Sequence, residues 1–334
     1  MTRRPLALTL GDPAGIGPEI VVKAWRALRN EDLAFFVIGD VQALRSAPGG
    51  GSGIARAISS PDEVAAIFSG ALPVLDLPLR APVVAGKPSP GAAEAVIRWI
   101  ETAAGLALSG TVGGVITAPI AKAPLYAAGF KCPGHTEFLG DLPAAARHDG
   151  ARGPVMMLTA GDLRTTLVTV HEPLSKVPQA LTIEGIVNTG LVTAQALRRD
   201  FGIAAPRIAV AGLNPHAGES GTIGQEEVRI VEPAVRALRD LGVDAKGPYP
   251  ADSLFPAEVR STYDAAVCLY HDQALIPVKM LDFWGGVNVT LGLPIVRTSP
   301  DHGTAFDIAG RGIARPDSLI AAIRLAAEIS GRRA

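Results

Sequence analysis

Short apolar runs alternate along the chain with longer segments of helical periodicity, and this alternation constrains the fold more than any other feature. Each run ends in a loop with Gly, Pro, Asn or His, as buried strands do. The alternation predicts an α/β fold with mostly parallel strands. The expected strands are 6–10, 33–38, 112–117, 155–158, 163–170, 208–211, 265–270 and 287–291, and the clearest expected helices are 18–29, 181–199, 226–241 and 317–329.

Length and composition narrow the class of protein. The 334 residues exceed what one hydrophobic core usually serves, so we expect two lobes. A net charge of −1 without long runs of one sign gives no electrostatic footprint for nucleic acid or an anionic membrane. The uncharged stretch 102–121 contains four glycines and a proline, which favours a helix end, a turn and a buried strand over a membrane span.

The expected compartment is the cytoplasm. The first apolar run has only five residues, too few for the core of an export signal. The two cysteines, Cys132 and Cys268, are too few for a disulfide framework, and Cys268 lies in an apolar run that favours a packed side chain over a nucleophile.

Five of the six histidines lie in Gly- or Pro-rich loops that follow expected strands, where open α/β sheets place their ligand sites. Three of these are His171, His216 and His271. Neutral imidazole is a common metal ligand, and three of them leave positions open for a substrate. Their separations of 45 and 55 residues match no local metal motif, so spacing alone leaves a structural, hydrogen-bonded role as the more frequent alternative for each.

Two further groups of residues have candidate binding roles. Lys279, Asn288 and Arg297 supply two cations and an amide, as a phosphate or carboxylate clamp requires, although solvated surface charges and a turn amide are the alternative. The segment 10–19 joins an expected strand to an expected helix and is glycine-rich. It is neither a dinucleotide fingerprint nor a P-loop, so it is either a ligand-binding turn or a structural one.

Together these motifs resemble the 4-hydroxythreonine-4-phosphate dehydrogenase family, from Leu8 to about Arg311. The resemblance implies a two-lobed, isopropylmalate-dehydrogenase-like α/β/α architecture with the active site in the cleft between lobes. One lobe would comprise residues 1–130 and 306–334, and the other residues 131–305. The motifs that carry it are Gly-Asp-Pro-Ala-Gly-Ile-Gly-Pro-Glu at 11–19, Pro-Gly-His-Thr-Glu at 133–137, Gly-Leu-Asn-Pro-His-Ala-Gly-Glu at 212–219, Pro-Ala-Asp-Ser-Leu-Phe at 250–255 and Tyr-His-Asp-Gln at 270–273.

The resemblance also implies roles for individual residues. His171, His216 and His271 would hold one divalent ion (Zn, Mg, Co or Mn), with one histidine supplied by the partner subunit of a homodimer. Asp252 falls on a catalytic acidic position. The segment Asp301, His302 and Gly303 would contact the cofactor, NAD or NADP. The substrate contacts would be His135, Thr136, Lys279, Asn288 and Arg297.

The implied reaction is the oxidation of 4-phosphohydroxy-L-threonine and its decarboxylation to 3-amino-2-oxopropyl phosphate, in pyridoxal phosphate (vitamin B6) biosynthesis. A related dehydrogenase that acts on erythronate phosphate or on an aromatic cis-dihydrodiol would use the same metal site. A metal-dependent lyase or aldolase without a redox step, or a non-catalytic protein that binds a phosphorylated ligand, would not need the cofactor segment.

Overall fold

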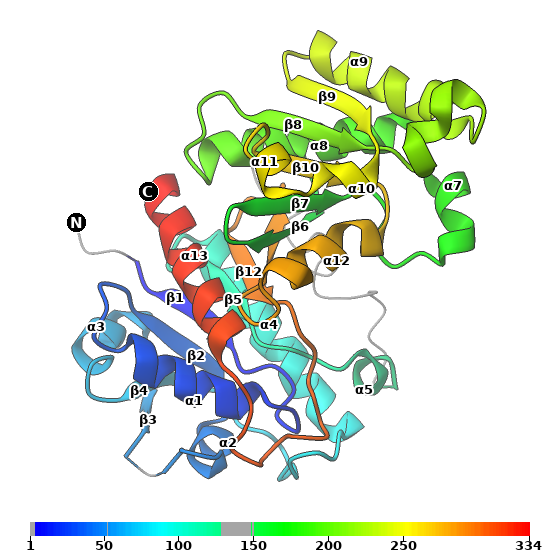
Figure 1. The fold of residues 1–334 in the computed structure, drawn as a ribbon. Helices are drawn as coiled ribbons and strands as arrows, with labels where there is room; N and C mark the ends of the chain where they lie inside the picture. Colours follow the sequence, from blue (N-terminus) through cyan, green and yellow to red (C-terminus); the bar gives the residue numbers. More distant parts are fainter. Residues whose placement is uncertain (1–3, 52, 128–147, 149) are drawn as a thin grey trace. The chain divides into compact units, whose positions relative to one another are not determined.

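The computed structural model describes residues 4–51, 53–127, 148 and 150–334 (Figure 1). Contacts divide these residues into two compact units. The first contains the described residues up to 127, together with 294–332 and 334, and the second contains 148, 150–293 and 333. The chain rejoins the first unit at residue 294, earlier than the expected return at 306, because strand β12 (Arg297–Pro300) pairs with β5 (Val115–Thr117) in that unit.

The first unit is built on a parallel sheet with the strand order β3-β4-β2-β1-β5-β12. Strands β1 and β2 are buried along their whole length, as expected for a parallel sheet with helices on its faces. Besides β5 and β12, the elements of this unit are β1 (Leu6–Thr9), α1 (Gly17–Leu28), β2 (Phe35–Gly39), α2 (Val41–Ser46), β3 (Ala55–Ile58), α3 (Val64–Ile67), β4 (Leu72–Asp76), α4 (Ala93–Leu108), α5 (Lys122–Ala127) and α13 (Asp317–Arg333). Helix α13 belongs to the first unit up to residue 332.

The second unit has the strand order β11-β6-β7-β10-β8-β9. Strands β7, β10, β8 and β9 run parallel. Strand β6 is antiparallel to both of its neighbours, β7 and β11, and a tight turn joins it to β7. The elements are β6 (Val155–Ala160), β7 (Leu163–Leu167), α7 (Val177–Ala180), α8 (Ile183–Arg199), β8 (Arg207–Ala211), α9 (Glu232–Asp240), β9 (Asp244–Tyr249), α10 (Ala251–Leu254), α11 (Ala257–Arg260), β10 (Ala265–Cys268), α12 (His271–Leu281) and β11 (Val287–Leu291).

The predicted α/β class with mostly parallel strands is therefore confirmed. The expected helix 226–241 is split, because a π-helical turn over Glu227–Val231 precedes α9. In the core of the second unit, Ala274 and Val278 of α12 pack with Cys268 of β10. Burial raises the pKa of the Cys268 thiol, which confirms the prediction of a packed side chain there. Among the described residues, no helix has both the length and the apolar character needed to cross a membrane.

Candidate active site

The three candidate metal ligands follow the carboxyl ends of β7, β10 and β8, which are neighbouring parallel strands of the second unit. His171 and His271 lie close together, with ring centroids 6.1 Å apart and ring planes inclined by 38°. His171 is exposed and the His271 side chain is 37% exposed, so both rings are accessible to an ion from solvent. This spacing fits two rings on either side of one ion, since a zinc–nitrogen bond is about 2.0–2.1 Å long.

The orientation of the His271 ring is fixed by its neighbour in sequence. The Nδ1 atom of His271 lies 2.8 Å from Oδ1 of Asp272 in a hydrogen bond. A carboxylate bound to one ring nitrogen leaves the other nitrogen, Nε2, to face an ion. His271 therefore has the arrangement of a metal-binding histidine.

His216 lies in an unusual turn. Five consecutive residues from His216 to Ser220 have positive φ, and four of them are not glycine, with φ from 42° to 54°. The left-handed conformation costs about 1–2 kcal/mol for each such residue, so other contacts must hold the turn. Buried Glu227 anchors the backbone just before the turn, because its Oε1 accepts hydrogen bonds from the backbone N–H groups of Leu213 and Asn214, both at 2.7 Å.

No three side chains of His, Cys, Asp or Glu in the described part of the chain lie close enough together to hold a metal ion. The structure thus brings His171 and His271 together and leaves the exposed His216 outside the pair. The three-histidine site stays a prediction.

The predicted substrate contacts are distributed over both units. In the second unit, Lys279 on α12 lies with its Nζ 5.3 Å from the Phe283 ring centroid. Asn288 on β11 has a buried Oδ1 atom for which the described residues provide no hydrogen-bond partner. In the first unit, buried Arg297 on β12 donates from Nη2 to Thr117 Oγ1 at 2.7 Å.

Asp252 is an exposed residue of α10 in the second unit. His135 and Thr136 lie outside the described residues. Their roles, like those of the clamp residues, stay predictions.

The glycine-rich turn after β1 packs against the predicted cofactor segment within the first unit. A Cβ atom on Gly15 would lie 2.9 Å from the carbonyl oxygen of Thr304, so only glycine allows this approach. The same oxygen accepts a hydrogen bond from Ile16 N at 3.0 Å. Close by, the buried Nε2 of His302 has no hydrogen-bond partner among the described residues. The turn therefore positions the segment that contains Asp301, His302 and Gly303.

Glu19 is a functional candidate that the sequence did not identify. Its side chain is 1% exposed and accepts hydrogen bonds from the backbone N–H groups of Ala314 (2.8 Å) and Gly312 (3.1 Å). Lys23 bonds the same carboxylate at 2.7 Å and also donates to the carbonyl oxygens of Gly312 and Ala314. A glutamate in the first turn of an apolar helix was the signal available in the sequence.

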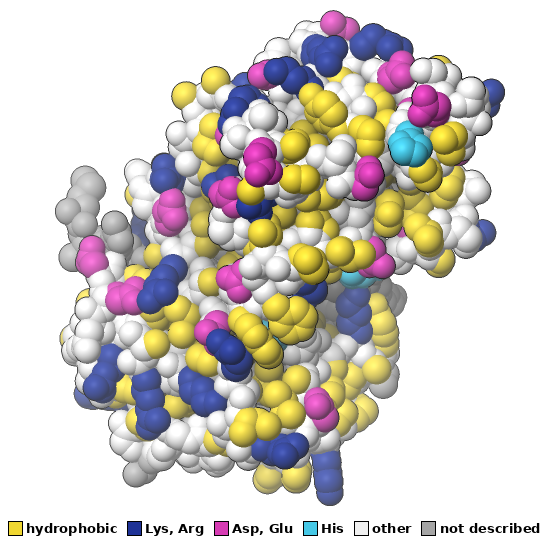
Figure 2. Space-filling view, in the orientation of Figure 1, with side chains coloured by type: hydrophobic (Ala, Val, Ile, Leu, Met, Phe, Trp, Pro, Cys, Tyr) yellow, Lys and Arg dark blue, Asp and Glu magenta, His cyan; other side chains and the backbone are white. Residues whose placement is uncertain are grey.

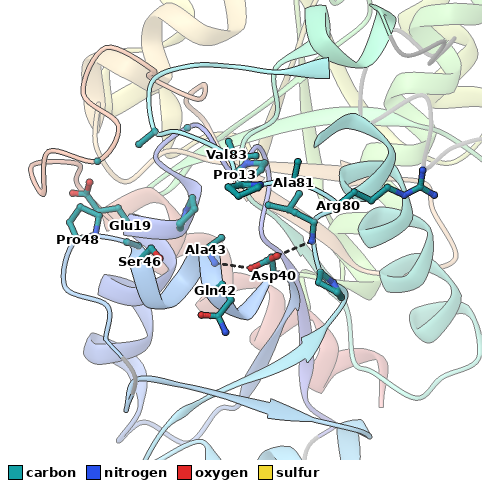
Figure 3. Close-up of a pocket in the computed structure, with 18 of the residues that line it drawn as sticks. Pro13, Glu19, Asp40, Gln42, Ala43, Ser46, Pro48, Arg80, Ala81 and Val83 are labelled. Atoms are coloured by element: carbon teal, nitrogen blue, oxygen red, sulfur yellow. Dashed lines mark hydrogen bonds between the residues drawn. The ribbon is translucent and has the colours of Figure 1, made fainter. Parts of the chain in front are cut away.

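A pocket of about 850 Å³ opens at the carboxyl ends of β1, β2 and β4 (Figure 3). Asp40 shapes one wall, because its carboxylate accepts hydrogen bonds from Ala43 N and Leu79 N, both at 2.8 Å. This end of a parallel sheet is the usual place for a ligand in open α/β folds. The lining includes Pro13, Gly15, Pro18 and Glu19 from the first turn, Asp40, Gln42, Ala43 and Ser46 around α2, Arg80 to Val83, and Gly310 and Arg311.

Two α/β units with ligand-type residues at the carboxyl ends of parallel strands define an enzyme-like protein of the α/β class. Residues 31–326 match the family described as pyridoxal phosphate biosynthetic protein PdxA, and the chain belongs to that family. It is 69% identical over 333 residues to the 4-hydroxythreonine-4-phosphate dehydrogenase of Caulobacter vibrioides, covering 100% of this chain and 99% of the relative. The resemblance inferred from the motifs is confirmed.

Solved structures agree with this placement. The 4-hydroxythreonine-4-phosphate dehydrogenase from Klebsiella pneumoniae has a TM-score of 0.86 and 41% identity, covering 98% of this chain and 99% of its own. A terephthalate 1,2-cis-dihydrodiol dehydrogenase from Burkholderia xenovorans is more distant, with a TM-score of 0.64, 32% identity and 98% of each chain covered.

Proposed function

We propose that the chain oxidises 4-hydroxythreonine 4-phosphate with NAD or NADP and releases carbon dioxide and 3-amino-2-oxopropyl phosphate. One observation carries the proposal: the exposed His171–His271 pair lies at adjacent strand ends in a chain 69% identical, over its full length, to an enzyme with that name. The substrate hydroxyl carbon loses a hydride to the nicotinamide and the hydroxyl loses its proton, giving a β-keto acid. That acid then loses its carboxyl group as carbon dioxide.

His171 and His271 are proposed to bind one divalent cation together with His216 of the partner subunit. The ring spacing of 6.1 Å supports the pair, and the position of His216 outside it supports a ligand from a second chain. Zinc, cobalt, manganese or magnesium bound there supplies a Lewis acid that lowers the pKa of the substrate hydroxyl and then polarises the ketone.

A homodimer fits the surface of the second unit. The side chains of Ile276, Met280, Phe283 and Trp284, on α12 and just after it, are 50–81% exposed. Figure 2 shows hydrophobic side chains gathered over this region. Contiguous exposed apolar residues mark an interaction surface, and a second copy of the chain would cover it by twofold symmetry. Because α12 begins at His271, this surface lies on the same helix as a proposed ligand.

The phosphate is proposed to contact His135, Thr136, Lys279, Asn288 and Arg297. The buried, unsatisfied Oδ1 of Asn288 supports its part, because such an atom needs a donor that a ligand can provide. Asp252 is proposed as the carboxylate that takes part in proton transfer. The cofactor is proposed to occupy the 850 Å³ pocket and to contact Asp301, His302 and Gly303, where the buried Nε2 of His302 has no hydrogen-bond partner among the described residues.

A second candidate is a cis-dihydrodiol dehydrogenase, favoured by the relative from Burkholderia xenovorans. Metal-loaded protein should be given NAD with 4-hydroxythreonine 4-phosphate, erythronate phosphate or an aromatic cis-dihydrodiol, and the rate of NADH formation compared. We expect the hydroxythreonine compound to give the highest kcat/KM. Faster turnover of either other substrate would refute the proposed substrate, and product without NADH would indicate a lyase.

Mixed dimers test the shared metal site. His171→Ala and His216→Ala proteins should each be inactive, but unfolding and refolding them together should restore about a quarter of wild-type activity, because one of the two sites in each mixed dimer keeps every ligand. A mixture of His171→Ala with His271→Ala is the control and should restore none. Equal activity in both mixtures would contradict the arrangement.

A further inference from the structure

One buried amide joins the backbones of two histidine-bearing loops. The Gln273 side chain is 6% exposed and follows His271 by two residues in the first turn of α12. Its Oε1 accepts a hydrogen bond from Leu269 N at 2.6 Å, and its Nε2 donates one to the carbonyl oxygen of Gly212 at 2.7 Å. Leu269 precedes His271, and Gly212 begins the loop that leads to His216.

Gln273 links the two loops just beyond the last paired residues of the sheet. The parallel pairing of β10 with β8 ends at Val267 and Val210, so the ladder does not join the two loops beyond this point. Without a further link, each loop could shift independently of the other. The Gln273 amide provides that link with both of its polar groups in use.

The third histidine-bearing loop joins at the same place. Thr169, two residues before His171, donates to the carbonyl oxygen of Leu269 from Oγ1 at 2.6 Å and from its backbone N at 3.2 Å. The loops that contain His171, His216 and His271 are thus connected through Leu269 and Gln273.

The loop on the Gly212 side is itself fixed. Glu227 is 1% exposed and holds Leu213 N and Asn214 N through Oε1, while its Oε2 accepts from Asn214 Nδ2 at 2.9 Å. The strained turn at His216 therefore begins from an anchored backbone. Gln273, which holds Gly212, and Glu227, which holds Leu213 and Asn214, together fix the backbone from which this turn begins.

We infer that Gln273 is a positioning residue that holds the His171–His271 pair in a fixed place relative to the loop from which His216 reaches the site of the partner subunit. The inference rests on the proposed function, because it gives Gln273 its importance through the metal ligands. Residues that orient metal ligands typically change metal affinity by about 10- to 100-fold when they are removed. A merely structural buried amide would change only the stability of the fold.

The test is metal affinity, measured by chelator competition with zinc and with cobalt on the full-length protein. Gln273→Met removes both hydrogen bonds at similar volume and should weaken binding about 10- to 100-fold. Thr193→Val is the matched control: Thr193 is also fully buried in the second unit, and its Oγ1 donates to Thr189 O at 2.7 Å and lies in hydrogen-bond contact with Thr166 Oγ1 at 3.1 Å. Thr193→Val should bind both metals with wild-type affinity, even if its melting temperature falls by as much as that of Gln273→Met.

The outcomes separate this inference from the proposed function. Wild-type affinity in Gln273→Met, at a lowered melting temperature, would overturn the positioning role and leave the metal site intact. Wild-type affinity in His271→Ala would overturn the metal site itself. If Gln273→Met does not fold, Gln273→Asn carries the test, because it keeps both polar groups on a side chain too short to reach both partners. It should weaken metal binding and shift the cobalt absorption spectrum.

Discussion

The two units use the carboxyl ends of their strands in different ways. In the first unit, a pocket of about 850 Å³ is lined largely by proline, alanine and glycine residues, and the carboxylates of Asp40 and Glu19 are occupied in holding loops. In the second unit, the loops present exposed imidazoles, and buried Gln273 and Glu227 hold the loops beneath them.

The ligands proposed for the two units would account for this difference. A dinucleotide is large and is bound by shape and by close approach of the backbone. An added Cβ atom that blocks this approach is therefore the change most expected to weaken its binding. A metal ion needs a few donors placed within fractions of an ångström, so the loops that carry them must be tied together. Four changes can break or sharpen this comparison, given in order of expected effect.

His271→Ala should have the largest effect. Loss of one of the three proposed ligands should lower kcat/KM by more than about 100-fold and release the metal. The fold should persist because the side chain is 37% exposed. NAD affinity, measured by fluorescence titration, should stay at the wild-type value, since the proposed cofactor pocket lies in the other unit. A parallel loss of NAD binding would show that metal binding and cofactor binding are not separated between the two units.

Gly15→Ala is the reciprocal change in the first unit. The new Cβ atom would lie 2.9 Å from the Thr304 carbonyl oxygen, so the turn and the cofactor segment must separate. We expect KM for NAD to rise about 10-fold, which corresponds to about 1.4 kcal/mol, with no change in metal affinity. Gly53→Ala, where nothing lies within 4 Å, is the control and should behave as wild type. Unchanged KM in Gly15→Ala would separate the turn from the cofactor.

Glu19→Gln tests how the first unit holds its C-terminal loop. The amide can accept only on one atom, so the buried hydrogen bonds to Gly312 N or Ala314 N and the contact with Lys23 are weakened. We expect the free energy of unfolding in urea to fall by about 1–3 kcal/mol. Glu94→Gln, which alters an exposed ion pair with Arg80, should change it by less than about 1 kcal/mol. Equal losses of unfolding free energy in the two variants would mean that the buried hydrogen bonds of Glu19 stabilise the fold no more than an exposed ion pair does.

Asp12→Asn should have the smallest effect and depends on pH. Burial raises the pKa of Asp12 above its ordinary value of 3.8, against the lowering by Ala14 N. A raised pKa in the folded state gives stability at low pH that is lost as pH rises through it, so the carboxylate destabilises the fold at neutral pH. The variant should gain up to about 1 kcal/mol at pH 7 and nothing below pH 3.8. An equal gain at both values would contradict this.

Much of the fold could be predicted from the sequence, because apolar strand runs and helical periodicity are local signals. The run 6–10, for example, became β1 and the segment 18–29 became most of α1. The strand-end histidines were also visible as residue types in loops. Their pairing was not, since it depends on β7 and β10 being neighbours in the sheet, which separates partners by about 100 residues in sequence.

The supporting residues could not be predicted for a similar reason. Glu227 lies in no motif, and Gln273 closes the Tyr-His-Asp-Gln motif without any sign of what it contacts. Their roles arise only when α12 and the π-helical turn pack beneath loops from other strands. The left-handed turn at His216 likewise has no local signal, because Ala217, Glu219 and Ser220 are types that disfavour positive φ.

The most direct test of the account compares metal-stripped and reloaded protein in one assay that follows NADH and carbon dioxide from 4-hydroxythreonine 4-phosphate. The reloaded protein should form one carbon dioxide for each NADH, whereas the stripped protein should bind NAD with unchanged affinity and form neither product. NADH formation at the full rate by the stripped protein, or carbon dioxide without NADH from the reloaded protein, would contradict the proposed division between a metal-binding unit and a cofactor-binding unit.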